Sequence, residues 1–504
     1  MAAPLRHALR LLAWAAVALI YLPLLPAAAL MALPALRRAR WLSLFADPQF
    51  SQALAATLVS TLLSVGGALI ITLTVVAALW PSGGWRRLAA RLPLLLAVPH
   101  VAFATAALLL FADGGWLSHL LPFFTPPVDR YGIGLGLAMA LKESAFLLWV
   151  VYGLLGEKRL AGQATVLKSL GYGRWQCLKW LVLPTLLPAL SIALLATAAW
   201  SLSAVDVALV IGPGNPPMLA VLAWQWLSQG DEIQQAKGAL ASLVLLLTHG
   251  IMALAAWGVW RLWRRRIPQV QGIRHTQPRA LAGKSFALLL PLCGVACALL
   301  LAAAAQNRQP VSDSVGNSLW LGLCSASLGA VICLLWLASG PSRFDGWIWL
   351  PLVDGQYQLA LYTWLDGEWV AVLWGHLLWV VPWMLFILRP AWRARDPRME
   401  LLARTLGWQR GRIFWLVTLP ALTRPLLTAL AVGFSVSIAQ YLPTLWLGGG
   451  RFPTLTSEAV ALSSGGETST LAAQALWQLL LPALFFAATA LLAWLTGRYR
   501  QGLR

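Results

Sequence analysis

The chain has 504 residues, of which 60% are hydrophobic and 11% charged, and its mean hydropathy is +0.73. A soluble protein could not keep so many apolar side chains from water, so the composition predicts an integral membrane protein without a large soluble domain. The net charge of +20 does not indicate nucleic-acid binding, because the basic residues lie in short segments between apolar runs rather than together on one exposed domain.

Apolar runs bounded by charged residues, glycine and proline predict the membrane spans. A helix crosses the hydrocarbon core with about 20 apolar residues. Twelve runs fit, near residues 10 to 34, 53 to 80, 92 to 112, 133 to 155, 185 to 211, 237 to 261, 286 to 305, 317 to 339, 347 to 365, 370 to 389, 421 to 446 and 470 to 496. We therefore expect an all-α membrane protein embedded in a lipid bilayer, whose first run is an uncleaved transmembrane helix rather than a signal peptide.

The basic residues indicate the topology. If the N-terminus is cytoplasmic and the chain alternates sides through twelve spans, most of the 37 lysines and arginines fall on the cytoplasmic side, and both termini are cytoplasmic. The chain then divides into a first six-helix half at residues 1–262, a basic cytoplasmic connector at 263–285 and a second six-helix half at 286–504. Since each half has an even number of spans, the halves are parallel repeats with a pathway expected between them.

One sequence pattern occurs once in each half. Gly171 is followed by nine residues and then by Leu-Val-Leu-Pro ending at Pro184, and Gly407 is followed by nine residues and then by Val-Thr-Leu-Pro ending at Pro420. A leucine precedes each glycine, and an arginine stands three residues after it. The agreement between copies 236 residues apart (171 and 407) indicates a duplicated unit.

Both copies fall in predicted cytoplasmic segments, near residues 157–184 (the first loop) and 391–420 (the second loop). In the second loop, Asp396 can cap a helix that Gly407 can end, a second short helix follows, and Pro420 suits the first turn of the next span. An apolar and basic helix pair of this kind can rest on lipid headgroups, and spacing alone leaves that alternative open. The duplication favours a partner with two-fold symmetry.

The pattern resembles the EAA signature of the permease subunits of binding-protein-dependent ABC importers, and it covers both halves as in the fused permeases of thiamine and ferric-iron systems. The resemblance implies a type I importer fold in a bacterial inner membrane, a cytoplasmic ATPase homodimer that receives the two loops as coupling helices, and a periplasmic solute-binding protein. The coupling residues that it implies are Leu170, Gly171, Arg174, Leu183, Pro184, Glu400, Leu406, Gly407, Arg410, Leu419 and Pro420.

The chain departs from this signature at the Glu-Ala-Ala triplet, whose positions hold Thr-Val-Leu at 165–167 and Leu-Leu-Ala at 401–403. Glu400 stands one residue early, so we expect the second loop to couple more strongly than the first. The sequence has no phosphate-binding loop either, because Pro278 occupies the position where the motif ending Gly283-Lys284-Ser285 would need its first glycine. ATP hydrolysis is thus expected on a separate subunit, and no catalytic residue, cofactor or metal site is expected here.

Polar residues in predicted spans are candidates for a translocation pathway, because an ionisable group in hydrocarbon costs about 2.5 to 3.5 kcal/mol and needs partners or water. The candidates are Lys142, Glu143, Asp206, His376 and Gln440, and Asp354 is a further polar residue in the ninth run. Lys142 and Glu143 point about 100° apart on a helix, so we expect one of them to pair across helices. From the sequence, these polar residues can either form hydrogen bonds between helices or line the translocation pathway, and both roles remain open.

A second class of function also remains open. An ion-driven secondary transporter can be built from parallel six-helix repeats, and it would use buried carboxylates such as Glu143 and Asp206 as ion sites. A membrane scaffold that transports nothing would need only the two loops. Uptake that requires an ATPase would favour the importer, whereas uptake that collapses with an ion gradient would favour the secondary transporter.

Overall fold

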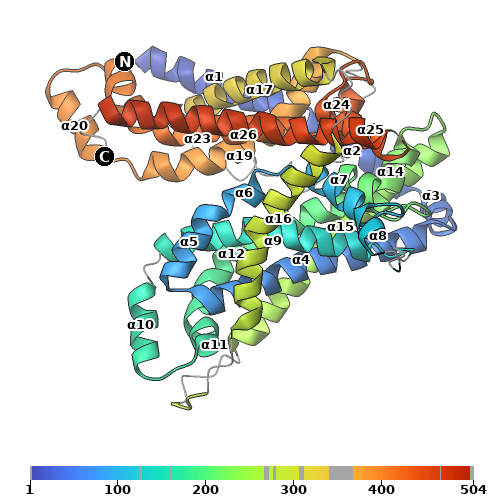
Figure 1. The fold of residues 1–504 in the computed structure, drawn as a ribbon. Coiled ribbons are helices and arrows are strands. Elements are labelled where there is room, and N and C mark those ends of the chain that lie inside the picture. Colours follow the sequence, from blue (N-terminus) through green and yellow to red (C-terminus); the bar gives the residue numbers. More distant parts are fainter. Residues whose placement is uncertain are drawn as a thin grey trace. The chain divides into compact units, whose positions relative to one another are not determined.

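The computed structural model describes residues 3–121, 123, 128–157, 160–265, 272–275, 280–305, 312–339, 367–465 and 467–499. Within these ranges every regular element is a helix, as Figure 1 shows. Helices suit a chain that crosses a bilayer, because each helix satisfies its backbone hydrogen bonds internally. The predicted all-α class is therefore confirmed for the described residues.

In the described ranges, nine helices are long and apolar enough to cross a membrane, or up to eleven if two bent helix pairs each count as one span. The nine are His7–Leu36, Phe50–Leu79, His100–Leu120, Ile133–Gly156, Glu232–Arg265, Leu281–Ala304, Asp313–Ser339, Trp369–Arg393 and Thr468–Thr496. The predicted run at 347 to 365 and Asp354 within it lie outside the described residues.

The chain packs into two compact units: unit 1 contains residues 1–30, 308–461 and 473–504, and unit 2 contains residues 31–307 and 462–472. The helices that lie mainly in unit 1 are α1 (Ala3–Tyr21), α2 (Leu24–Ala32), α17 (Ser312–Ser339), α19 (Trp369–Arg393), α20 (Pro397–Thr405), α21 (Arg410–Ile413), the π-helical turn η6 (Phe414–Thr418), α22 (Leu419–Ala421), α23 (Thr423–Ile438), α24 (Leu442–Leu447), α25 (Leu455–Ser463) and α26 (Thr468–Tyr499).

The helices of unit 2 are η1 (Leu33–Leu36), α3 (Arg38–Phe45), α4 (Phe50–Leu79), α5 (Gly83–Arg91), α6 (Pro93–Leu96), α7 (His100–Phe111), α8 (Trp116–Leu120), α9 (Ile133–Glu157), α10 (Ala161–Ser169), α11 (Arg174–Cys177), the π-helical turn η2 (Leu178–Val182), α12 (Leu183–Ser203), α13 (Asp206–Ile211), α14 (Leu219–Leu227), α15 (Glu232–Arg265) and α16 (Leu281–Ala304).

Two predicted spans are interrupted near one end. The fifth run, at 185 to 211, holds α12, a break and then the short α13, and the eleventh, at 421 to 446, holds α23, a break and then α24. Each of these two predicted spans therefore contains a break in its helix. The residues at the breaks are mostly apolar, so hydropathy continues through them and does not reveal where the helix stops.

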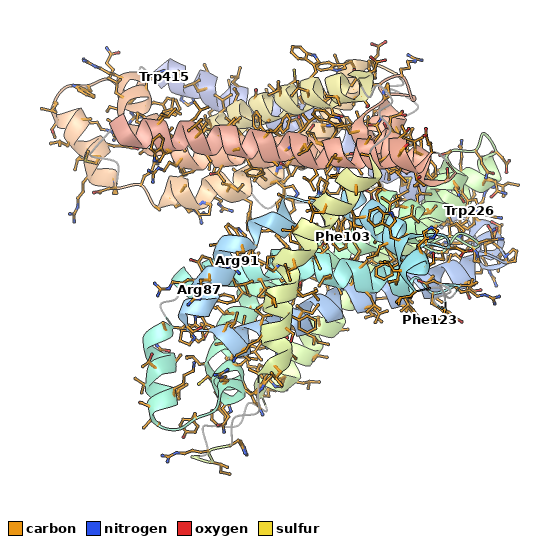
Figure 2. All side chains as sticks on the ribbon, viewed as in Figure 1. Arg87, Arg91, Phe103, Phe123, Trp226 and Trp415 are labelled. Carbon is orange, nitrogen blue, oxygen red and sulfur yellow. The ribbon has the colours of Figure 1, made fainter. Side chains whose placement is uncertain are left out.

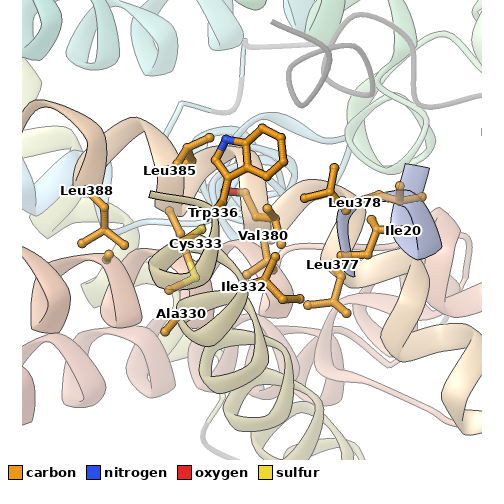
Figure 3. Packing of buried hydrophobic residues seen from close by; sticks show 14 of the residues in the cluster. Ile20, Ala330, Ile332, Cys333, Trp336, Leu377, Leu378, Val380, Leu385 and Leu388 are labelled. Atoms are coloured by element: carbon orange, nitrogen blue, oxygen red, sulfur yellow. Dashed lines mark hydrogen bonds between the residues drawn. The ribbon is translucent and has the colours of Figure 1, made fainter. Parts of the chain in front are cut away.

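The core of unit 1 forms where α1 lies against α17 and α19. Ile20, Trp336 and Val380 from these three helices are almost completely buried in one cluster, which Figure 3 shows from close by. The rings of Trp14 and Trp336 meet edge to face with their centroids 5.2 Å apart, and Trp374 Nε1 donates a hydrogen bond to the Ile20 carbonyl at 3.0 Å. The first helix of the chain is thus packed with helices of the second sequence half.

In unit 2, small residues let helices approach closely. A Cβ added to Gly67 of α4 would lie 2.7 Å from the Cβ of Ala140 on α9, and one added to Gly283 of α16 would overlap the Thr74 carbonyl of α4. Close packing is the main attraction between helices in lipid, where the hydrophobic effect no longer distinguishes neighbours. Helix α16, which begins within the predicted connector and continues into the second sequence half, is thus packed with helices of the first sequence half.

These contacts give the packed units different boundaries from the predicted halves at 1–262 and 286–504. Helix α1 belongs to the first half in sequence and packs in unit 1, whereas α16 belongs to the second half and packs in unit 2. The halves describe the order of the spans along the chain, and the units describe their packing. Hydropathy indicates the order of the spans along the chain but does not indicate which apolar helices pack against each other.

Replacing Gly283 with alanine is expected to destabilise the protein by about 1 to 3 kcal/mol, because the added methyl group forces α16 away from the α4 backbone. The matched control is Gly250→Ala in α15, where an added Cβ meets no described atom within 4 Å and alanine has the higher helix propensity. Thermal unfolding of both variants in detergent measures the difference. Equal Tm values for the two variants would contradict this packing.

Candidate functional site

The first loop contains a helix that ends at a glycine with left-handed backbone. Gly171 follows α10 with φ of +88°. Its N–H donates to the Lys168 carbonyl at 3.0 Å, and the N–H of Tyr172 donates to the Leu167 carbonyl at 3.1 Å. These two bonds form a Schellman motif, which satisfies the last carbonyls of the helix. Glycine stands here because it has no Cβ to clash at positive φ.

The second loop has the same turn. Helix α20 starts at the predicted cap, where Asp396 Oδ1 accepts the Arg398 N–H at 2.9 Å, so that prediction is confirmed. Gly407 has φ of +79°, and the N–H groups of this residue and the next bond to the carbonyls of Arg404 and Ala403, each at 3.0 Å. Each of these turn positions is offset by 236 residues from its equivalent in the first loop (171 and 407).

A short helix and a π-helical turn follow each glycine. Arg174 and Arg410 are the first residues of α11 and α21, which continue directly into η2 and η6. The leucine and proline of each pattern, ending at Pro184 and Pro420, come next and are half-buried. Proline has no N–H for the helical ladder, so it is compatible with the irregular turn that precedes it. Both copies of the sequence pattern thus encode the same backbone path.

Each path then bends sharply. The angle is 66° between Arg174–Pro188 and Leu190–Ser203, and 71° between Arg410–Ala421 and Thr423–Ile438. A loop helix that meets its span at such an angle lies closer to the membrane plane than to the membrane normal if the span crosses steeply. The prediction that Pro420 begins the next span is wrong, because Pro420 lies in α22 and the span starts beyond the bend.

Two cations fix the first loop to α4. Lys168 Nζ donates to the Trp80 carbonyl at 3.3 Å, and Arg174 Nη1 donates to the Ala78 carbonyl at 3.1 Å. Both carbonyls lie at the C-terminal end of α4, where helix carbonyls lack intrahelical partners and the dipole attracts positive charge. Burial lowers the pKa of Lys168, and Cys177 raises it in part while Arg174 lowers it.

Glu400 joins the two helical parts of the second loop. Its Oε1 accepts hydrogen bonds from Arg395 Nη1 at 2.6 Å and from Thr418 Oγ1 at 3.2 Å. The equivalents of Glu400 and Thr418 in the first loop are Ala164 and Val182, and both are buried. Glu400 therefore acts inside its loop, and the first loop has two buried apolar side chains in place of this polar link.

Apolar side chains lie on the outside of both loops. Val166 and Leu170 are 58% and 50% exposed, and their equivalents Leu402 and Leu406 are 57% and 66% exposed. Trp415 of η6 is also exposed and is labelled in Figure 2. Large apolar groups gathered on a surface indicate contact with a protein or with lipid. The exposed apolar side chains of the second loop therefore face away from its own chain.

In unit 2, the two neighbouring ionisable residues of α9 both pair with other elements. Lys142 Nζ donates to the Leu95 carbonyl of α6 at 3.0 Å, and Glu143 Oε1 lies 2.6 Å from His100 Nε2 of α7. The His100 ring also lies against Trp200, with centroids 4.1 Å apart. The prediction that one of the two residues pairs across helices is confirmed, and the other does so as well.

In unit 1, the predicted residues His376 and Gln440 belong to one hydrogen-bond network. His376 Nδ1 lies 2.7 Å from Ser437 Oγ, and its Nε2 lies 2.8 Å from Thr444 Oγ1. Gln440 Nε2 donates to the His376 carbonyl at 3.2 Å from the break between α23 and α24. Asp206 stands at the corresponding break of unit 2, as the first residue of α13.

Sequence reasoning missed several of these groups. His100 carried no signal because it lies 43 residues from Glu143 and belongs to no histidine cluster. The hydroxyl partners of His376 are common residues in apolar helices, so only their positions in space distinguish them. Gln176, an amide near the start of α11, was missed for the same reason.

The comparisons with known proteins agree with the resemblance. Residues 285–500 match the family described as binding-protein-dependent transport system inner membrane component. The whole chain aligns with the whole of the inner membrane ABC transporter permease protein YnjC of Escherichia coli (strain K12), at 59% identity over 511 positions. No solved structure matches the chain. The chain therefore belongs to the inner membrane permeases of binding-protein-dependent ABC transport systems, as a transport subunit and not an enzyme.

Proposed function

We propose that the first and second loops are the docking sites for a cytoplasmic ATPase. ATP hydrolysis by that ATPase would drive the import of a solute delivered by a periplasmic binding protein. The family works with ATPase and binding-protein partners in general, and it does not favour an ion-coupled secondary transporter. The main support for this assignment of the loops is their repeated geometry, a Schellman turn followed by a short helix, a π-helical turn and a bend of 66° or 71°.

The repeated geometry also supports the kind of partner. A homodimeric ATPase presents the same groove twice, so it requires two equivalent protrusions on the permease. Exposed apolar side chains at matching positions, Leu170 with Leu406 and Val166 with Leu402, meet that requirement. A lipid surface would accept one such segment in any conformation, and it gives no reason for two loops to share a backbone path.

The coupling mechanism follows from how the second loop is built. Glu400 links α20 to the π-helical turn, and the turn continues through α22 and the bend into α23. A displacement of α20 by the ATPase would therefore be transmitted to α23 instead of being absorbed in the loop. The far end of α23 carries Ser437, which bonds His376, so movement of the loop would reach the polar network inside the unit.

For the whole chain we propose twelve transmembrane helices in two parallel six-helix repeats, with both termini in the cytoplasm. The positions of the basic residues support this orientation. The polar residues Lys142, Glu143, Asp206, His376 and Gln440 would border the route of the solute within their own units. The external binding protein would select the solute.

Replacing Gly407 with valine is expected to weaken coupling, because a β-branched residue at φ of +79° is strained by roughly 1 to 2 kcal/mol or more and would distort the turn. Asparagine tolerates this conformation better, so Gly407→Asn is the matched control. Co-purification of the ATPase and solute uptake in membrane vesicles measure the effect. Wild-type values for Gly407→Val at equal protein level would contradict the docking assignment.

Replacing Arg410 with alanine tests the same assignment without backbone strain. Loss of a cation at the start of α21 is expected to lower ATPase co-purification several-fold while leaving the Tm of the permease unchanged. The control is Arg86→Ala, which removes an exposed cation from α5, away from both loops in sequence. If both alanine variants retain the ATPase equally well, Arg410 has no part in docking.

Glu143→Gln tests the pathway assignment. The amide can still hydrogen-bond to His100 but removes the negative charge, so solute uptake is expected to fall several-fold while ATPase co-purification stays normal. Uptake by proteoliposomes, compared at equal permease content and equal Tm, provides the measurement. Unchanged uptake would assign Glu143 to helix-to-helix bonding alone.

A further inference from the structure

The described residues 272–275 of the basic connector contact the first loop and hydrogen-bond to its Gln176 side chain. Residues 272–275 are described and exposed. Gln176 Nε2 donates to the Ile273 carbonyl at 2.8 Å, and the His275 N–H makes a long hydrogen bond of 3.4 Å to Gln176 Oε1. The same oxygen accepts the Gly173 N–H at 2.9 Å, which fixes the amide at the start of α11.

This contact brings a guanidinium group beside the turn of the first loop. A Cβ built on Gly171 would lie 3.1 Å from Cδ and 3.4 Å from Nε of Arg274. At Gly407, the equivalent position of the second loop, no described atom lies within 4 Å of such a Cβ. The two turns have the same backbone, but only the first has a connector side chain against it in the described structure.

The two loops also differ in their own exposed cations. Among the described residues 160–184, Lys168 and Arg174 are half-buried with their head groups on α4 carbonyls, and Lys179 is the exposed cation. The matching residues 396–420 of the second loop expose Arg398, Arg404 and Arg412. Gln176 stands at the position equivalent to Arg412, so the first loop has an amide where the second has a guanidinium.

We propose that Arg274 is an ATPase-docking residue of the first loop, supplied by the connector and positioned by Gln176. The inference rests on the proposed docking function of the loops. A homodimeric ATPase offers both loops the same surface, so a carboxylate that meets Arg412 at one loop needs a cation at the other. Arginine suits that role because its guanidinium pairs with a carboxylate through two parallel hydrogen bonds. The partner surface is thus an acidic patch on the ATPase.

The experiment uses the full-length permease together with the ATPase that co-purifies with it. A photo-cross-linking amino acid is placed at Ser169 or at Thr405, which are equivalent exposed positions on α10 and α20. Arg274→Ala is expected to lower the cross-link yield from position 169 by about two- to fivefold, the effect of losing one exposed ion pair, without changing the yield from position 405. Arg412→Ala is expected to lower the cross-link yield from position 405 without changing the yield from position 169.

Lys284→Ala is the matched control, because it removes an exposed cation at the start of α16. It is expected to leave both yields unchanged. If Arg274→Ala behaves like Lys284→Ala while Arg412→Ala still lowers its own cross-link, the role of Arg274 is wrong and the docking function stands. If unmodified permease gives no ATPase cross-link from either position, the docking function itself fails.

Gln176→Leu tests the positioning step. The variant keeps a side chain of similar size but cannot hold the connector, so backbone exchange at His275 should become faster and the yield from position 169 should fall as far as in Arg274→Ala. The double variant should fall no further, because both changes remove the same contact. Additive losses in the double variant would show that Gln176 does not position Arg274.

Discussion

A left-handed glycine ends the first helix of the first loop and of the second loop, and the shape of each loop depends on it. At Gly171 and Gly407 the backbone has positive φ, so the next helix starts in a new direction. The N–H groups of the turn donate hydrogen bonds to the last carbonyls of the helix that has ended. The π-helical turn, the proline and the bend then set the direction of Leu190–Ser203 within α12 and of α23. One residue without a side chain thus lets two helical segments meet at a tight turn.

Small residues and hydrogen-bonded polar pairs also determine how the helices pack inside each unit. Helices in lipid approach closely where small residues face each other, and several buried polar groups of each unit find partners on neighbouring helices. His376 is satisfied through both ring nitrogens, and Glu143 is satisfied by His100. These bonds hold α19 to α23 in unit 1 and α7 to α9 in unit 2. The polar residues therefore hold neighbouring helices together within each unit.

Local features of the loops were predictable from sequence, because short-range chemistry determines them. The cap at Asp396 and the stop at Gly407 need only neighbouring residues, and the structure has both. The packing of α1 and α16 was not predictable, since the sequence of an apolar helix does not indicate which other helix it will contact. The His100 and Glu143 pair was missed because its members are far apart in sequence. The helix breaks before Asp206 and Leu442 were missed because the residues at them are mostly apolar.

The packing of α1 with α17 and α19 has a consequence for biogenesis. Residues 3–21 leave the ribosome first, whereas their neighbours at 312–339 and 369–393 follow only after more than half of the chain has been made. Helix α1 must therefore stay in the bilayer without its final neighbours during most of synthesis. Likewise, α16 comes from the second half of the sequence and packs in unit 2. Neither sequence half therefore contains all the helices of one unit, so each unit can be completed only with a helix from the other half.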